Sequence, residues 1–175
     1  QELISARSRQ HFDIVVIPGG IPSDILKQFG NSIYVVDGPA TEDETLIKAN
    51  IPEARSAIIL TDTALHPNNA DAKVLMITLA VETLNRDVYT CAQIMNSENS
   101  IHLKRANVDE LILFDVIGAN LSVASALSPG VTRMVSELIH FDEGSELYKL
   151  DPPVPNHLDG MNFNEAIKWF SDKNM

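Results

Sequence analysis

Cysteine, long apolar runs and positive charge are all scarce in this sequence of 175 residues. The single cysteine, Cys91, rules out an intrachain disulfide and a multi-cysteine metal site, and its apolar strand context predicts a buried core thiol. No apolar run approaches the roughly 20 residues that span a bilayer, and residues 1–7 lack the apolar core of a signal peptide. We therefore expect a soluble segment that is not inserted in the membrane.

The charge balance narrows the possible partners. The chain has 13 basic and 24 acidic residues, which gives a net charge of −11. Such a charge repels nucleic acid and anionic membrane surfaces, and it leaves cations as possible ligands beside its plain effect on solubility. The sequence has no Gly-x-Ser-x-Gly elbow, no P-loop and no cysteine and histidine at a readable catalytic spacing, so we expect no enzyme.

Five apolar segments of strand length alternate with helical patterns, and they cover residues 12–17, 33–36, 57–60, 88–94 and 111–114. This alternation predicts an α/β fold with a parallel sheet that is buried on both faces. Thr41 followed by Glu44 is a capping-box pattern for one of the helices. The longest helical pattern, residues 70–85, is apolar around most of its circumference and should be deeply buried, with Asp71 in its first turn complementing the helix dipole.

Two further helical patterns, residues 116–127 and 131–139, flank the turn Ser128-Pro129-Gly130 and predict a helix-turn-helix elbow. The elbow has more apolar side chains than one small helix pair can hide. Either another subunit or the chain's own sheet would have to cover them. The candidate interface residues are Leu121, Val123, Ala124, Leu127, Met134, Val135 and Leu138.

The composition changes after residue 139, where prolines cluster in Asp151-Pro152-Pro153-Val154-Pro155 and indicate a linker or the rim of another module. A short strand is expected over 146–150, and Asn162 with Glu165 should cap a final helix. The expected division is therefore residues 1–139, a lobe of sheet and crossover helices, and residues 140–175, a linker and the start of a small α+β lobe.

Several blocks occur in the order typical of one family. They are Val36 to Ile51, which contains Asp37-Gly38-Pro39-Ala40-Thr41, then Ala57 to Asp62, Asn69 to Lys73, Ser97 to Asn99, His102 to Ala106, Asp109-Glu110 and Gly144 to Tyr148. Together they resemble the RCK (regulator of K+ conductance, or KTN-type) domain of potassium channels and transporters. The resemblance covers nearly the whole chain.

The resemblance implies a Rossmann-like fold and a cytoplasmic, ligand-sensing regulatory domain of a potassium channel. Such a domain pairs with a second copy through the elbow, within a gating ring that controls a fused or separate pore. Two alternatives stay open. One is a regulatory subunit of a separate potassium uptake transporter, and the other is a degenerate nucleotide-dependent oxidoreductase.

Two features depart from the family pattern. The opening strand and its Gly-x-Gly-x-x-Gly turn do not occur, which predicts an open sheet edge beside residues 12–17. Pro18 or Gly19 stands where the family places a ribose-binding carboxylate, and Pro18-Gly19-Gly20 reads as a plain turn. Dinucleotide binding in the usual mode is thus not expected, and the cofactor stays unassigned.

The second departure concerns calcium, which some members bind with acidic residues after two neighbouring strands. Here the first region offers Thr61-Asp62-Thr63, but the second reads Ala92-Gln93-Ile94-Met95, a poor ligand set for a hard cation. Calcium binding in that mode is not expected, although a divalent cation bound in another way is possible.

The candidate ligand-binding residues are Asp37, Thr61, Asp62 and Thr63, because ligands of open parallel sheets bind beyond the carboxyl ends of the strands. The alternative is that each aspartate simply accepts bonds from the turn that follows. Asp62 with His66 is a weak candidate pair for a transition metal, against the reading of His66 as an ordinary surface histidine.

Overall fold

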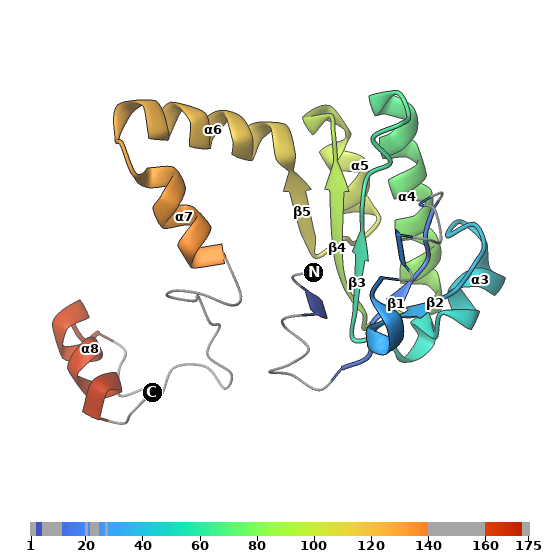
Figure 1. The fold of residues 1–175 in the computed structure, drawn as a ribbon, viewed down its shortest axis with the longest axis horizontal. Coiled ribbons are helices and arrows are strands. Elements are labelled where there is room, and N and C mark those ends of the chain that lie inside the picture. The colour runs from blue at the N-terminus through green and yellow to red at the C-terminus, as the bar shows by residue number, and fades with distance from the viewer. Residues whose placement is uncertain are drawn as a thin grey trace. The chain divides into compact units, whose positions relative to one another are not determined.

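The computed structural model describes residues 3–4, 12–19, 21, 25–26, 28–139 and 160–172 of the chain (Figure 1). The chain divides into two compact units, residues 1–136 and 137–175. The first unit contains the sheets and most of the helices, and it has the α/β organisation that the alternating pattern predicts. The strand expected over 146–150 lies outside the described residues.

All observed strand pairs are parallel and form two groups. β1 (Val15–Val16) pairs with β2 (Tyr34–Val35), and β3 (Ser56–Ile59), β4 (Tyr89–Ile94) and β5 (Glu110–Leu113) form a sheet in that order. Within the described residues, β1 pairs with β2 alone and β3 with β4 alone. The open edge expected beside residues 12–17 is therefore present in this part of the chain.

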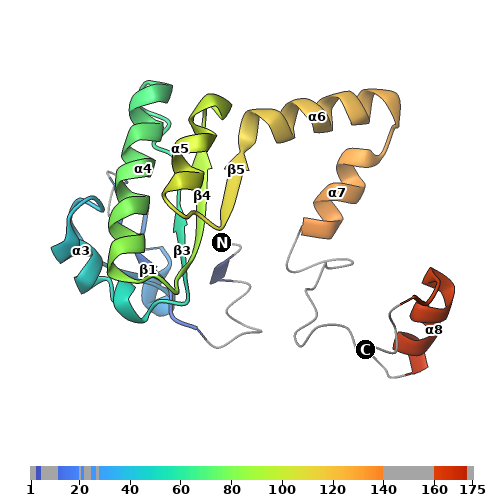
Figure 2. The same cartoon turned by 180° about the vertical axis from the view of Figure 1, so that it is seen from behind.

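The connections between strands are helical. They are α3 (Asp43–Lys48), α4 (Pro67–Leu84) and α5 (Ser100–Arg105), with short 3-10 turns at Gly30–Ser32, Ile51–Glu53 and Ser97–Asn99. Figures 1 and 2 show α4 and α5 on the same face of the sheet formed by β3, β4 and β5. The buried core lies between these helices and the sheet and consists of Leu46, Ile59, Val74, Val81, Val88, Ala92, Ile94 and Leu103.

Only one face of this sheet is buried by the described residues, so the expectation of a sheet covered on both faces is wrong for this part of the chain. Along β4, Thr90, Ala92 and Ile94 are buried, whereas Tyr89 is exposed and Cys91 is only partly buried. The cause is the two-residue period of a strand, which turns alternate side chains away from α4 and α5. Cys91 is accordingly not the core thiol that its context predicts.

The helix boundaries correct three expectations. α4 begins at Pro67, a favourable first helical residue, so Asp71 lies beyond the first turn. The outer side of α4 is exposed at Met76 and Leu79, so this helix is not buried all round. α3 begins after Glu42 without a side-chain cap, because Thr41 lies one residue too early for a capping box.

The last helix, α8 (Phe163–Asp172), has the predicted cap. The Glu165 amide donates to Asn162 Oδ1 at 3.0 Å, and the Asn162 amide donates to Glu165 Oε2 at 3.2 Å. This reciprocal pair satisfies two backbone donors that the first helical turn leaves without intrahelical partners.

The predicted elbow is present as α6 (Phe114–Leu127) and α7 (Val131–Ile139). The hydroxyl groups of Ser125 and Thr132 form a hydrogen bond that joins the two helices. Neither helix contains a buried residue. No helix in the described part of the chain is both long enough and apolar enough to span a bilayer.

Candidate functional site

Three of the candidate residues, Thr61, Asp62 and Thr63, lie in the loop that follows β3 and precedes α4. The Thr61 hydroxyl donates to the Gln93 carbonyl of β4 at 2.8 Å, which connects the carboxyl ends of the two strands. The carboxylate of Asp62 is held on both sides, because the Ala64 amide donates to Oδ1 at 3.2 Å and Lys73 Nζ lies 3.2 Å from Oδ2. Thr63 is exposed in the same loop.

These contacts also set the electrostatics of Asp62. Its hydrogen bond from Lys73, followed by that from the Ala64 amide, lowers the pKa of its carboxyl group below the ordinary value. The side chains of Lys73 and Asp62 are 38% and 31% exposed, so water screens the pair. The bond from Ala64 is the turn interaction that the sequence left as an alternative, and the ammonium of Lys73 is an addition that the loop sequence alone does not reveal.

The structure does not bring the remaining candidates to this point. Asp37 follows β2, is exposed, and makes no hydrogen bond to Asp62 within the described residues. His66 is exposed at the residue before α4, where its carbonyl accepts from the amides of Asn69 and Ala70. Within the described ranges, no group of three or more His, Cys, Asp or Glu side chains is placed to hold a metal ion.

Asp71 has more contacts than the helix-dipole role predicted from the sequence requires. Its side chain is 1% exposed, and its two oxygens accept from the amides of Met95 and Asn96 and from Asn99 Nδ2 at 2.8, 2.9 and 2.8 Å. The carboxylate therefore joins α4 to the carboxyl end of β4 and to the turn before α5. Its oxygens are engaged by the protein, so its role is to shape the edge where Thr61 and Asp62 lie.

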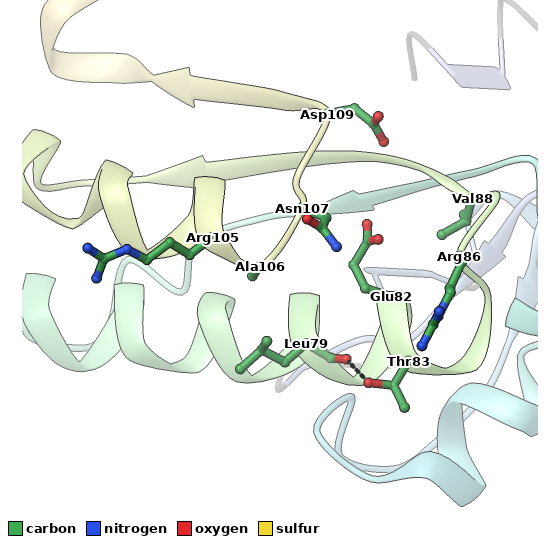
Figure 3. Close-up of a pocket in the computed structure, with 9 residues that line it drawn as sticks. All are labelled: Leu79, Glu82, Thr83, Arg86, Val88, Arg105, Ala106, Asn107 and Asp109. Atoms are coloured by element: carbon green, nitrogen blue, oxygen red, sulfur yellow. Dashed lines mark hydrogen bonds between the residues drawn. The ribbon is translucent and has the colours of Figure 1, made fainter.

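A cavity of about 570 Å3 lies at the opposite end of the sheet, between the end of α4 and the segment that joins α5 to β5. Figure 3 shows Glu82 extending from α4, Arg86 from the turn after that helix and Asp109 from the segment before β5, while Arg105 points away from the other charged groups. The buried Thr90 organises this end. Its hydroxyl donates to Glu82 at 2.7 Å, and its amide donates to Asp109 at 2.7 Å. These bonds join α4, β4 and the start of β5. The carboxylates of Glu82 and Asp109 therefore have hydrogen-bond partners within the protein.

The predicted interface residues lie on the elbow, and none of them is buried. Leu127 is 79% exposed, Val123 61% and Met134 56%, whereas the other four, Leu121, Ala124, Val135 and Leu138, are partly buried. The neighbouring Phe114 and Ile117 add further exposed apolar surface to α6. Monomeric proteins rarely expose apolar groups so densely without a partner for them.

Comparison with known proteins gives the chain's relationship. Residues 7–114 match the TrkA-N domain family. The chain is 24% identical over 138 residues to the calcium-gated potassium channel TvoK of Thermoplasma volcanium, covering 77% of this chain and 39% of that channel. It is 26% identical over 151 residues to the putative potassium channel protein YugO of Bacillus subtilis, covering 82% of this chain and 43% of YugO. The chain thus spans about two fifths of the relatives' length.

Among solved structures, the human SLO3 gating ring is similar to this chain, with a TM-score of 0.60, 18% identity, and coverage of 82% of this chain and 26% of the gating-ring chain. This likeness concerns the fold, and it agrees with the Rossmann-like architecture expected from the sequence. The family match extends over more than half of the chain and includes the five strands that the structure describes and the candidate loop. The chain belongs to the TrkA-N domain family, which confirms its resemblance to the regulatory domains of potassium channels.

Proposed function

We propose that this chain is a ligand-sensing regulatory domain on the cytoplasmic side of a potassium channel, and that it acts as a dimer within a larger ring. The observation that carries the proposal is the elbow, two helices of an α/β domain whose apolar side chains remain unburied. The relatives support the channel assignment, because TvoK and YugO are both named as potassium channels. Their names favour a channel over a separate uptake transporter.

The apolar side chains of the elbow argue for a second copy of the chain as the partner. Val123 and Leu127 lie four residues apart on α6, so they share one face of that helix. The hydrogen bond between Ser125 and Thr132 links the end of α6 to the start of α7. The exposed apolar side chains of the two helices therefore lie on connected segments. A symmetric dimer buries the same patch on both copies, which removes two exposed apolar surfaces with a single interface.

Ligand sensing is assigned to the carboxyl ends of the strands, with Thr61, Asp62 and Thr63 as the leading residues and Asp37 as a separate candidate. The support is positional. Residues 60–66 form the loop that joins β3 to α4, and Asp71 holds α4 to the end of β4. A ligand that changes this loop can therefore alter how α4 packs on the sheet, and a regulatory domain needs that kind of coupling between a site and a packed element.

A regulatory role is preferred to catalysis because both named relatives are channels and the chain has no hydrolase or P-loop motif. The oxidoreductase alternative makes a different prediction. It requires turnover in a hydride-transfer assay with NADH and a carbonyl substrate, and the regulatory assignment predicts none.

The test is the oligomeric state of the 175-residue chain in sedimentation velocity at about 50 µM, a concentration suited to interfaces of micromolar affinity. We expect a dimer. Leu127→Glu and Val123→Glu should each raise the dimer dissociation constant at least about tenfold, because each places a charge in an apolar interface. Thermal unfolding of the monomer should change little, since both side chains are exposed.

Ile47→Glu is the matched control. Ile47 is 53% exposed on α3, so the variant makes the same kind of apolar-to-acidic change away from the elbow. It should leave the dimer intact. A wild-type chain that is monomeric at this concentration, or elbow variants that dimerise as tightly as Ile47→Glu, would contradict the proposed interface.

A further inference from the structure

The loop that contains Asp62 is the place where the fit of a calcium ion can be tested against the residues present. TvoK is named as a calcium-gated channel, and calcium binding needs about six to eight oxygen ligands, usually with several carboxylates. At the carboxyl ends of β3 and β4, hydrogen bonds fix the position of two carboxylates, Asp62 and Asp71, and Glu98 is exposed in the turn after β4. No three such groups in the described residues are placed to hold a metal ion. The fit of calcium to this edge therefore depends on whether these oxygens are available.

Both carboxylates already accept hydrogen bonds from the protein. Asp71 is buried, and its two oxygens accept three N–H donors, so a cation there would have to enter a closed place and compete with those donors. Asp62 accepts from the Ala64 amide on one oxygen and from Lys73 on the other. The Thr61 hydroxyl is directed to the Gln93 carbonyl. The residues present do not fit calcium.

Lys73 places a full positive charge next to the Asp62 carboxylate, whereas the other donor to that carboxylate is the uncharged amide of Ala64. It lies in the second turn of α4, and its ammonium nitrogen sits 3.2 Å from Asp62 Oδ2. The ammonium group thus occupies one of the positions next to the carboxylate that an added cation would use. A divalent ion would therefore have to displace Lys73, or bind beside it against the repulsion of its charge.

We propose that Lys73 is a tethered counter-ion that keeps divalent cations from the Asp62 loop and so determines which class of ligand this edge accepts. The inference rests on the proposed ligand site, and it identifies Lys73 as the specificity-determining residue of that site. The lowered pKa of Asp62 is consistent with a close ammonium group. Because Lys73 is partly exposed, the exclusion is competitive, and removing the ammonium exposes a carboxylate that is already oriented by the Ala64 amide.

The experiment uses Mn2+ as the probe, because it is a divalent ion that prefers oxygen ligands and broadens NMR signals near its binding site. The 175-residue chain is titrated at low ionic strength, and the amide signals of Asp62 and Ala64 are followed. In the wild type they should broaden no earlier than those of exposed acidic residues such as Glu44. In Lys73→Gln they should broaden at about fivefold to tenfold lower Mn2+ concentration.

Three further variants make the result specific. Lys73→Arg keeps the charge and should behave as the wild type. Lys48→Gln, at the end of α3, makes the same change in net charge elsewhere and should also leave Asp62 unchanged. The double variant Asp62→Asn with Lys73→Gln should lose the gained binding, which would place the ion on the Asp62 carboxylate.

Three results would overturn the proposal: equal broadening of Asp62 in the wild type and in Lys73→Gln, an equal effect of Lys48→Gln, or survival of the gained binding in the double variant. The amide spectrum reports folding in every sample, and the partly exposed Lys73 is not one of the core residues. These outcomes are independent of dimer formation. A failure at Lys73 therefore leaves the elbow test intact, and a failure of the elbow leaves this one intact.

Discussion

Replacing Asp71 should destabilise the domain more than replacing any exposed acidic residue. Its buried carboxylate accepts three hydrogen bonds, at 2.8, 2.9 and 2.8 Å, from Met95, Asn96 and Asn99. Asp71→Ala leaves three donors without an acceptor in a buried place, where each unsatisfied group costs about 1–3 kcal/mol before relaxation. Partial access of water to the vacated space reduces that sum, so we expect the free energy of unfolding to fall by about 3–5 kcal/mol.

A second variant keeps the test informative if Asp71→Ala does not fold. Asp71→Asn retains one oxygen, which can keep the two bonds that Oδ2 accepts, but it turns an NH2 group toward the Met95 amide. One bond is lost and two donors face each other, so the expected loss is about 1.5–3 kcal/mol.

The assay for both variants is urea unfolding followed by circular dichroism, with hydrogen exchange of the Met95 amide as a local probe. Glu44→Ala, in the exposed first turn of α3, is the control and should stay within about 0.5 kcal/mol of the wild type. If Asp71→Ala unfolds within about 1 kcal/mol of the wild type, the carboxylate does not join α4 to the end of β4 in the way described.

Two other predictions concern chemistry and backbone strain. Burial, and to a smaller extent the charge of Glu110, raises the pKa of the Cys91 thiol. Because the thiolate is the reactive form, the rate of alkylation by iodoacetamide should reach half its maximum at a higher pH than for a free cysteine peptide. Glu110→Gln should lower this midpoint pH only slightly. A midpoint at or below the peptide's would show that Cys91 is not desolvated. Gly38 has φ +144°, and an added Cβ would collide with the buried Thr45 hydroxyl. Gly38→Ala should therefore lower the free energy of unfolding in urea by about 1–3 kcal/mol. Gly118→Ala, in the interior of α6 where nothing lies near the added Cβ, should leave that free energy unchanged or raise it by up to about 1 kcal/mol. Equal effects at the two glycines would refute the strain argument.

The elements with a strong local pattern were well predicted from the sequence. The helix expected over 131–139 is α7 with the same bounds, and the strands expected over 57–60 and 111–114 each begin and end one residue earlier in the structure. The bounds of these elements are predictable because the residue pattern and the end signals that determine them are local. α4 begins three residues before the expected position, although Pro67 is itself a start signal that could have located its beginning.

The candidate site was less predictable, because its decisive contacts join distant parts of the chain. The partners of Asp71 lie 24 to 28 residues away, beyond an intervening helix and strand, so the sequence offered only a helix-dipole role for this residue. Asp62 shows both situations. Its bond to Ala64 spans two residues and follows from turn chemistry, whereas Lys73 meets it only because α4 packs back against the end of β3.

The prediction that both faces of the sheet are buried is wrong for the described residues, and the reason lies in the strand registers. Continuous apolar runs of strand length predict burial on both faces, as in fully covered parallel sheets. The registers, however, place Cys91 opposite Glu110 and Gln93 opposite Ile112, and Tyr89 donates its hydroxyl to Glu110 at 2.9 Å. Tyr89 and Gln93 on β4 and Glu110 on β5 are polar groups on one face, which therefore keeps some contact with water, whereas the opposite face has Ala92 and Ile94 in the core. The sequence therefore contained the signal, but it becomes readable only when β4 and β5 are aligned with each other.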